Sequence, residues 1–332
     1  MGCGPECLLS ERQGGIRTFI RIICMKISRL KIIWIAALLI LTGLTMAASS
    51  TASGQTDRAR PFALSAAQTV NGSTLWLEID TDHLENPVTV LKAQFQNQSI
   101  PLYVHPLKPG VKYFGLVALP LTSKPGRTHV TVDWTDTEGQ HTQNIPFDIA
   151  TGSYRTDTLT VEPGKVNLKK SDLERVKREK KELKHIWQNA SDYSLWNSEF
   201  QLPIESEITS SFGNQRMFNG QLKSFHRGTD FRAAVGKPIM AANAGTVKLA
   251  KGLFYSGNLV IVDHGTGVFS LYAHLSRIDV VAGQYIEKGQ QIGLAGATGR
   301  VNGPHLHWGI KVNGTYVDPL QFLNAIKSLL MK

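Results

Sequence analysis

The chain has 332 residues, of which 42% are hydrophobic and 19% are charged, so it is long and apolar enough for two folded domains. Its net charge of +10 suits an anionic polymer or membrane surface, although proteins without such partners often carry a similar charge. All three cysteines (Cys3, Cys7 and Cys24) precede Met25, which excludes disulfides, a cysteine nucleophile and a cysteine-liganded zinc site from the rest of the chain.

The N-terminal region has the pattern of an export signal. Basic residues open the segment 25–48, a largely apolar stretch follows over 32–44, and small residues follow at 47–50, as in a secretory signal peptide. Because residues 32–56 carry no charge, an uncleaved membrane anchor is the alternative. Because the cysteines all precede Met25, Met25 is predicted to be the true start and residues 1–24 a non-native extension.

Residues 57–152 show short alternating strands. In 73–79 the residues Leu75, Leu77 and Ile79 fall on one face, and the same alternation recurs in 128–134. Prolines interrupt these runs at short intervals, which predicts an immunoglobulin-like β-sandwich domain. Its histidines match no ligand spacing and suggest no chemistry; they are His83, His105, His129 and His141.

A helix follows within 165–195. The sequence Ser171-Asp172-Leu173-Glu174 has the form of a capping box, and apolar residues follow at helical spacing. This segment is predicted to be a linker helix between domains, with His185 exposed or packed beside Trp187. The charged run 177–184 is interpreted as a solvated helix face, so no nucleic-acid partner is predicted.

The region 200–325 is rich in glycine and in short strands. Strands are expected at 246–250, 259–263, 268–275, 291–295 and 306–312, with a helix only at 319–330. The fold class is therefore mainly β: an N-terminal sandwich, a linker helix and an antiparallel β domain at the C-terminal end.

Four histidines and one carboxylate carry the candidate chemistry. In a strand, His305 and His307 would point to one face while Leu306 packs behind them. His226 and Asp230 are four residues apart, and His274 ends an apolar strand. Each pattern has a plain structural alternative, namely surface histidines, a chance spacing or a core histidine. Together they are the ligand types of a zinc site that keeps an open position for water.

These residues alone leave open whether His305 or His307 binds the metal. His264 is a separate case, because it lies at the end of a strand beside Gly265. An imidazole at such a position often bonds to the backbone, so a structural role is predicted for it.

Three segments resemble the motifs of the M23 (lysostaphin/LytM-type) zinc metallopeptidases. They are His226–Asp230, Leu271–Ser276 and Gly303–His307, and the similarity covers about residues 200–323. It extends through Ser211-Phe212-Gly213, Gly245-Thr246-Val247, Glu287-Lys288-Gly289-Gln290 and Thr298-Gly299. The resemblance implies a single zinc ion bound by His226, Asp230 and His307, with His274 and His305 as the catalytic histidines.

The implied function is hydrolysis of peptide bonds in bacterial peptidoglycan. His305 would act as general base, and His274 would stabilise the oxyanion or protonate the leaving amine. The single β domain and export segment favour the envelope or periplasm of a Gram-negative bacterium and the D-alanyl–diaminopimelate crosslink.

Two other functions remain open. One is a latent or non-catalytic envelope regulator that keeps the metal site, and the other is an endopeptidase acting on glycine-rich proteins. An envelope regulatory protein is a candidate partner, and contact with a membrane is expected only through the N-terminal segment.

Overall fold

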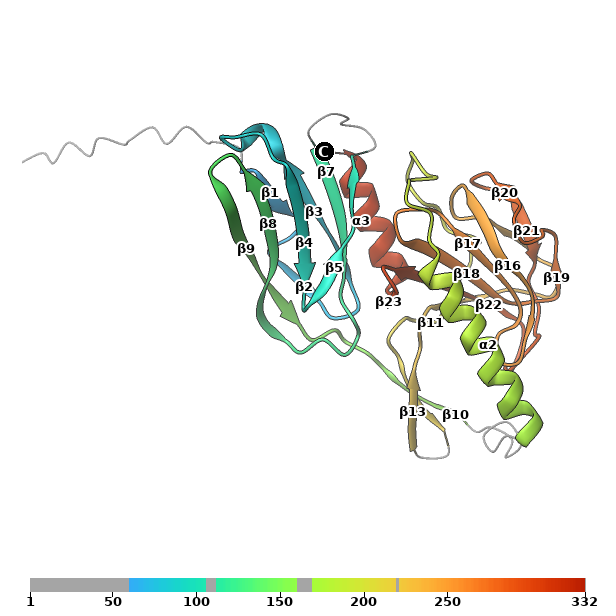
Figure 1. The fold of residues 1–332 in the computed structure, drawn as a ribbon. Coiled ribbons are helices and arrows are strands. Elements are labelled where there is room, and N and C mark those ends of the chain that lie inside the picture. The colour runs from blue at the N-terminus through green and yellow to red at the C-terminus, as the bar shows by residue number, and fades with distance from the viewer. Residues whose placement is uncertain (1–59, 106–111, 160–168, 219–220, 332) are drawn as a thin grey trace, which may run out of the picture. The chain divides into compact units, whose positions relative to one another are not determined.

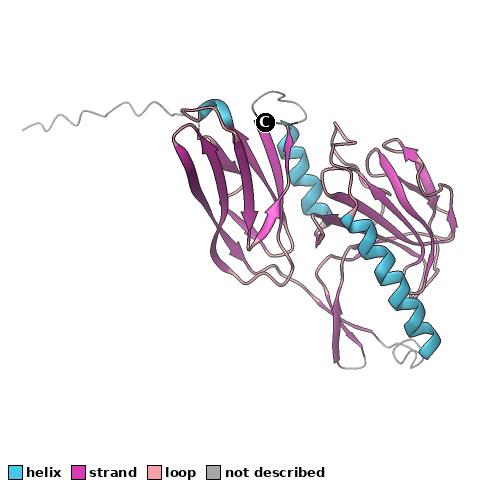
Figure 2. Cartoon of the chain, viewed as in Figure 1, coloured by secondary structure: helices cyan, strands magenta, loops and turns pink. Residues whose placement is uncertain are grey.

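The computed structural model describes residues 60–105, 112–159, 169–218 and 221–331. The predicted extension 1–24 and export segment 25–48 lie outside these residues. The described part is mainly β, as predicted (Figure 2). Its helices are η1 (Thr81–His83), α2 (Lys170–Gln188) and α3 (Pro319–Met331), and none of these is long and apolar enough to cross a membrane.

Two sheets pack face to face in the N-terminal part (Figure 1). One has the order β1-β3-β7-β6, formed by Phe62–Leu64, Thr74–Asp80, Lys112–Ala118 and Leu102–Val104. The other has the order β2-β9-β8-β4-β5, formed by Gln68–Val70, Gly139–Ala150, Gly126–Asp136, Val90–Phe95 and Gln98–Ile100. The β-sandwich is therefore confirmed, whereas its immunoglobulin-like character stays a prediction.

Strand β3 is buried on both of its faces. The predicted face, Leu75, Leu77 and Ile79, packs between the sheets with at most 2% exposure. Trp76 on the opposite face is also only 1% exposed, because it packs against the C-terminal part, where its indole N–H donates to the Ser328 hydroxyl in α3 at 3.0 Å. The described residues accordingly belong to one compact unit.

The C-terminal part is built on one antiparallel sheet of order β11-β14-β22-β18-β17-β16-β20, with β23 also paired to β22. These strands are Ile208–Ser210, Thr229–Arg232, His305–Val312, Val268–Leu275, Gly257–Asp263, Gly245–Leu253, Tyr285–Ile286 and Thr315–Val317. A smaller antiparallel sheet has the order β15-β21-β19, formed by Pro238–Met240, Gln291–Leu294 and Arg277–Ile278. The expected strands and the helix α3 are confirmed.

A third small sheet, which the sequence does not predict, joins the two parts of the chain. Strand β10 (Thr156–Leu159) leaves the sandwich and pairs in parallel with β12 (Gln215–Phe218). Strand β12 forms a hairpin with β13 (Gln221–Phe225), which ends directly before His226. The segment that follows the sandwich is thus attached to the strands that lead into the candidate site.

Helix α2 differs from the prediction in two respects. It begins at Lys170 with Lys169 as its N-cap, and no side chain caps it, so Ser171 lies within the first turn and the predicted capping box is wrong. The Leu173 N–H bonds to the Lys169 carbonyl instead. The helix also packs on the sheet rather than merely linking domains, since Leu183, Ile186 and Trp187 contact the apolar cluster around Phe269.

Candidate functional site

Neighbouring strands place the candidate residues at one end of the main sheet. Asp230 on β14 is the direct partner of His307 on β22, and Ala273 on β18 is the partner of His307 on its other side. His226 lies just ahead of β14, and His274 lies near the end of β18. Leu306, between the two β22 histidines, is fully buried, as the alternation predicts.

Three side chains meet closely enough to share one ion. His226 Nε2 lies 2.9 Å from Asp230 Oδ1, and His307 Nδ1 lies 2.7 Å from the same oxygen. The ligand atoms of all three lie within 4.8 Å of one another, and this is the only such group among the described residues. Two imidazoles and a carboxylate suit zinc and leave a coordination position open.

The electrostatics of the group keep its carboxylate ionised. Burial by itself raises the pKa of Asp230, but hydrogen bonds from His226 and His307 outweigh it and hold this pKa far below its usual range. A glycine is required at position 228, because a Cβ there would lie 2.8 Å from the His307 ring. The cluster therefore combines a charged acceptor with closely packed imidazoles.

The loop before β12 sets the orientation of His226. The His226 ring donates Nδ1–H to the Ser211 carbonyl at 2.8 Å, which directs Nε2 towards Asp230. The backbone of His226 also bonds to this loop twice, through the Gly213 N–H and the Asn214 carbonyl, each at 2.8 Å. Such contacts fix the tautomer and ring orientation of a metal ligand. These contacts are a physical reason for the Ser211-Phe212-Gly213 motif, for which no role could be predicted from the sequence.

The other two histidines border the same space. The ring of His274 lies 4.9 Å from that of His305 and 6.0 Å from that of His307, measured between centroids. His305 Nε2 lies 3.9 Å from Asp230 Oδ2. His305 and His307 keep 20% and 21% of their side-chain surface exposed, so solvent reaches the site.

Backbone carbonyls orient both rings. His274 adopts a left-handed backbone with φ of 65°, and its Nδ1–H donates to the Thr298 carbonyl at 2.8 Å. Burial lowers the pKa of His274 to about 3, so its ring is neutral near pH 7. His305 donates Nδ1–H to the Gly303 carbonyl at 2.9 Å. With Nδ1–H donated in this way, the neutral form of either ring has no proton on Nε2.

The remaining histidines stay away from this cluster. His264 is fully buried and bonds to the Ala244 carbonyl and the Ser270 hydroxyl, each at 2.7 Å, which confirms the structural prediction. His185 is exposed on α2. In the sandwich, His105 is buried beside Phe114, and His141 stacks on Trp134.

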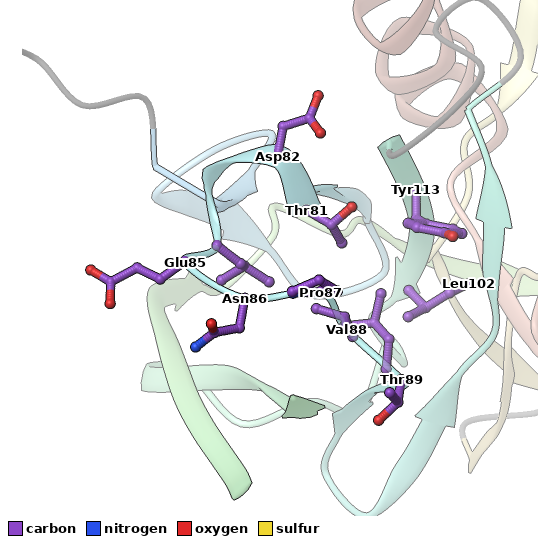
Figure 3. Close-up of a pocket in the computed structure, with 11 residues that line it drawn as sticks. Thr81, Asp82, Glu85, Asn86, Pro87, Val88, Thr89, Leu102 and Tyr113 are labelled. Carbon is purple, nitrogen blue, oxygen red and sulfur yellow. The ribbon is translucent and has the colours of Figure 1, made fainter. Parts of the chain in front are cut away.

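The sandwich contains a separate pocket of about 750 Å³ (Figure 3). It lies between the segment that joins β3 to β4 and the strands β6 and β7. Its acidic residues, Asp82 and Glu85, point away from its interior, where Leu102 and Tyr113 form an apolar wall. Among the described residues, its lining includes no histidine or cysteine.

Comparisons with known proteins agree on the C-terminal part. The model of peptidase family M23 matches residues 224–319. Peptidoglycan DD-endopeptidase ShyA of Vibrio cholerae is 37% identical over 131 residues, which cover 39% of this chain and 30% of that protein. Peptidoglycan DD-endopeptidase ShyC of the same organism is 42% identical over 114 residues, which cover 34% of this chain and 26% of that protein. The chain thus spans less than a third of the length of these relatives.

Among the solved structures that resemble the chain is one that matches most of it. It is described as "putative peptidase M23 from Pseudomonas aeruginosa", is 30% identical and has a TM-score of 0.57. The match covers 77% of this chain and 95% of that one, so it includes the sandwich as well as the main sheet. Given this coverage and the family match over the residues that form the site, the chain belongs to peptidase family M23.

Proposed function

We propose that the protein is an exported zinc-dependent endopeptidase that hydrolyses the stem-peptide crosslinks of peptidoglycan. The observation that carries this proposal is the meeting of His226, Asp230 and His307 within 4.8 Å, with His274 and His305 beside them. Relatives named peptidoglycan DD-endopeptidases support the substrate class. The proposed location is the periplasm or envelope of a Gram-negative bacterium.

In this proposal His226, Asp230 and His307 hold the zinc ion. When bound, zinc would polarise the scissile carbonyl and lower the pKa of a water molecule towards neutrality. The carboxylate of Asp230 suits this task because its lowered pKa keeps it ionised across the working range of a peptidase. His226 is held for the same purpose by its bond to the Ser211 carbonyl.

His305 is the proposed general base. Because its Nδ1–H is donated to the Gly303 carbonyl, its Nε2 is free to accept a proton from the attacking water. His274 is the second proposed catalytic residue. Its Nδ1–H is likewise donated to the Thr298 carbonyl, so it could donate from Nε2 to the oxyanion or the leaving amine only after Nε2 has taken up the proton that the base removes from the attacking water.

The D-alanyl–diaminopimelate bond is the proposed crosslink, since the named relatives are DD-endopeptidases. The sandwich, proposed to be immunoglobulin-like, would position the substrate or bind an envelope regulatory protein. A latent regulator is less favoured, because all five site residues are present and the two β22 histidines remain reachable by solvent.

The test is a digest of purified peptidoglycan analysed by mass spectrometry, with and without a chelator. Crosslinked dimers should become monomers only without chelator, and the products identify the bond that is cut. His305→Ala should retain one zinc ion per chain and lose turnover, because it removes the base and none of the proposed ligands. An elastin-like peptide serves as the alternative substrate.

The proposal is wrong if wild-type protein with stoichiometric zinc leaves the crosslinks intact. Cleavage of the elastin-like peptide alone would favour the glycine-rich protein substrates. Wild-type turnover by His305→Ala would assign the base to another residue.

A further inference from the structure

Helix α2 lies on the same face of the main sheet as the proposed zinc site. Along β22, His305, His307 and Lys311 point to one face, and the Lys311 ammonium lies 5.4 Å from the Trp187 ring of α2. The neighbouring strand β18 presents Phe269, Leu271 and Ala273 on this face, and they pack in one cluster with the apolar side of α2. The helix therefore lies beside the strands that carry the site.

The contacts of α2 determine which way each side of it faces. One side faces the β16–β17 hairpin, where Glu179 accepts the Phe254 N–H at 2.9 Å and Glu182 pairs with Lys251 at 2.7 Å. Trp187, across the apolar stripe from these glutamates, instead contacts Phe269 on β18 and Lys311 on β22. The side of the helix beyond Trp187 consequently faces β22 and the zinc site.

Lysines occupy that side. Residues three and four apart share one stripe of a helix, and the stripe beyond Trp187 consists of Leu173, Lys177, Lys180 and Lys184. All four are exposed. The glutamates Glu179 and Glu182 lie on the other side, where they bond to the hairpin. The side that faces the site is therefore cationic.

The lysines lie level with the site along the strands. Glu182 pairs with Lys251, whose strand partner is Leu259. The residues on either side of Leu259 pair with Tyr272 and Leu275, so Leu259 is level with Ala273 along the strands. Ala273 is in turn the strand partner of His307. Lys180 and Lys184 lie within one helical turn, about 5.4 Å, of Glu182 along the helix axis, and Lys177 extends the stripe towards the level of His305.

We propose that Lys177, Lys180 and Lys184 form a cationic wall beside the zinc site and bind free carboxylates of the peptidoglycan stem peptide. This inference rests on the proposed function, and it names the chemistry by which the same site selects its substrate. The occupant is an anionic peptide, because the wall is cationic and Arg227, exposed beside His226, adds positive charge near the site. Lysine suits this role as a flexible point charge that can reach carboxylates of a mobile polymer.

The test compares two double variants of the full chain that remove equal charge. Lys177→Gln/Lys180→Gln alters the wall, and Arg178→Gln/Lys181→Gln alters exposed positions on the solvent side of the same helix turn. KM and kcat are measured with a soluble crosslinked muropeptide dimer at low ionic strength, and with the same dimer after its carboxylates are amidated. Binding of the intact dimer is measured separately in the presence of a chelator, so that it does not depend on turnover.

Each exposed ion contact should contribute a factor of about two to five to binding. The wall variant, which removes two such contacts, should therefore raise KM and the dissociation constant about fivefold or more and leave kcat unchanged. The solvent-side variant should change either by less than about twofold. Wild-type protein should bind the amidated dimer as weakly as the wall variant does. Equal effects of the two variants, or wild-type binding that is indifferent to amidation, would overturn the inference. Carboxylate-dependent binding without turnover would support the wall and reject the proposed function.

Discussion

The buried His264 predicts a specific dependence of stability on pH. Its imidazole is fully buried, and burial lowers its pKa from 6.5 to about 4. The unfolded chain therefore takes up a proton below pH 6.5, whereas the folded protein resists it until about pH 4. Stability from this group is complete above pH 6.5 and is lost as the pH falls through that window.

The magnitude follows from the difference of 6.5 − 4 = 2.5 pKa units. At about 1.4 kcal/mol per unit, the whole window is worth about 3.5 kcal/mol, and the part between pH 7.5 and 4.5 about 2.5 kcal/mol. Solvent does not reduce this contribution to stability, because the ring is enclosed and bonded to the Ala244 carbonyl and the Ser270 hydroxyl. A loss of this size is a large fraction of the stability of a typical domain.

The assay is urea unfolding of metal-free wild type and His264→Asn at both pH values. Asparagine keeps a donor near the Ala244 carbonyl but does not titrate, so all other ionisable groups cancel in the comparison. Wild type should lose about 2.5 kcal/mol more than the variant between pH 7.5 and 4.5. An equal or smaller loss in wild type would refute a buried neutral His264.

Three further predictions concern the site and its support. Asp230→Ala should lose most of the bound zinc, because it removes the carboxylate that both imidazoles contact; near-stoichiometric metal by elemental analysis would contradict the assignment. Gly213→Ala should raise the zinc dissociation constant about tenfold, because a Cβ there would lie 2.2 Å from the Tyr154 ring and displace the loop that orients His226. An unchanged dissociation constant in a chelator competition would show that the loop is dispensable. Leu306→Ala should lower the free energy of unfolding by about 3 kcal/mol, as the side chain is fully buried behind the site; a loss below about 1 kcal/mol in urea would mean that the core closes around the cavity.

Local periodicity determined much of the fold in advance. Alternation placed Leu75, Leu77 and Ile79 in the sandwich core and set His305 and His307 on one strand face, because successive side chains in a strand point to opposite sides whatever packs against them. The structural role of His264 could be predicted for a similar reason, since its bonds involve nearby strands and a turn. The resemblance to the M23 motifs implied which five residues gather, and the structure brings them together.

Only the tertiary structure decided how these elements combine. Trp76 is buried on the face that alternation assigns to solvent, because α3, distant in sequence, covers it. Ser171 does not cap α2, because the helix already begins at Lys170. The position of α2 on the sheet depends on its contacts with Phe254 and Lys251, which lie about 70 residues after the helix residues that they contact. The orientation of His226 and His274 depends on the carbonyls of Ser211 and Thr298, and a backbone carbonyl leaves no signature in the sequence. Periodicity is a local property of the chain, whereas these contacts exist only after distant segments have packed together.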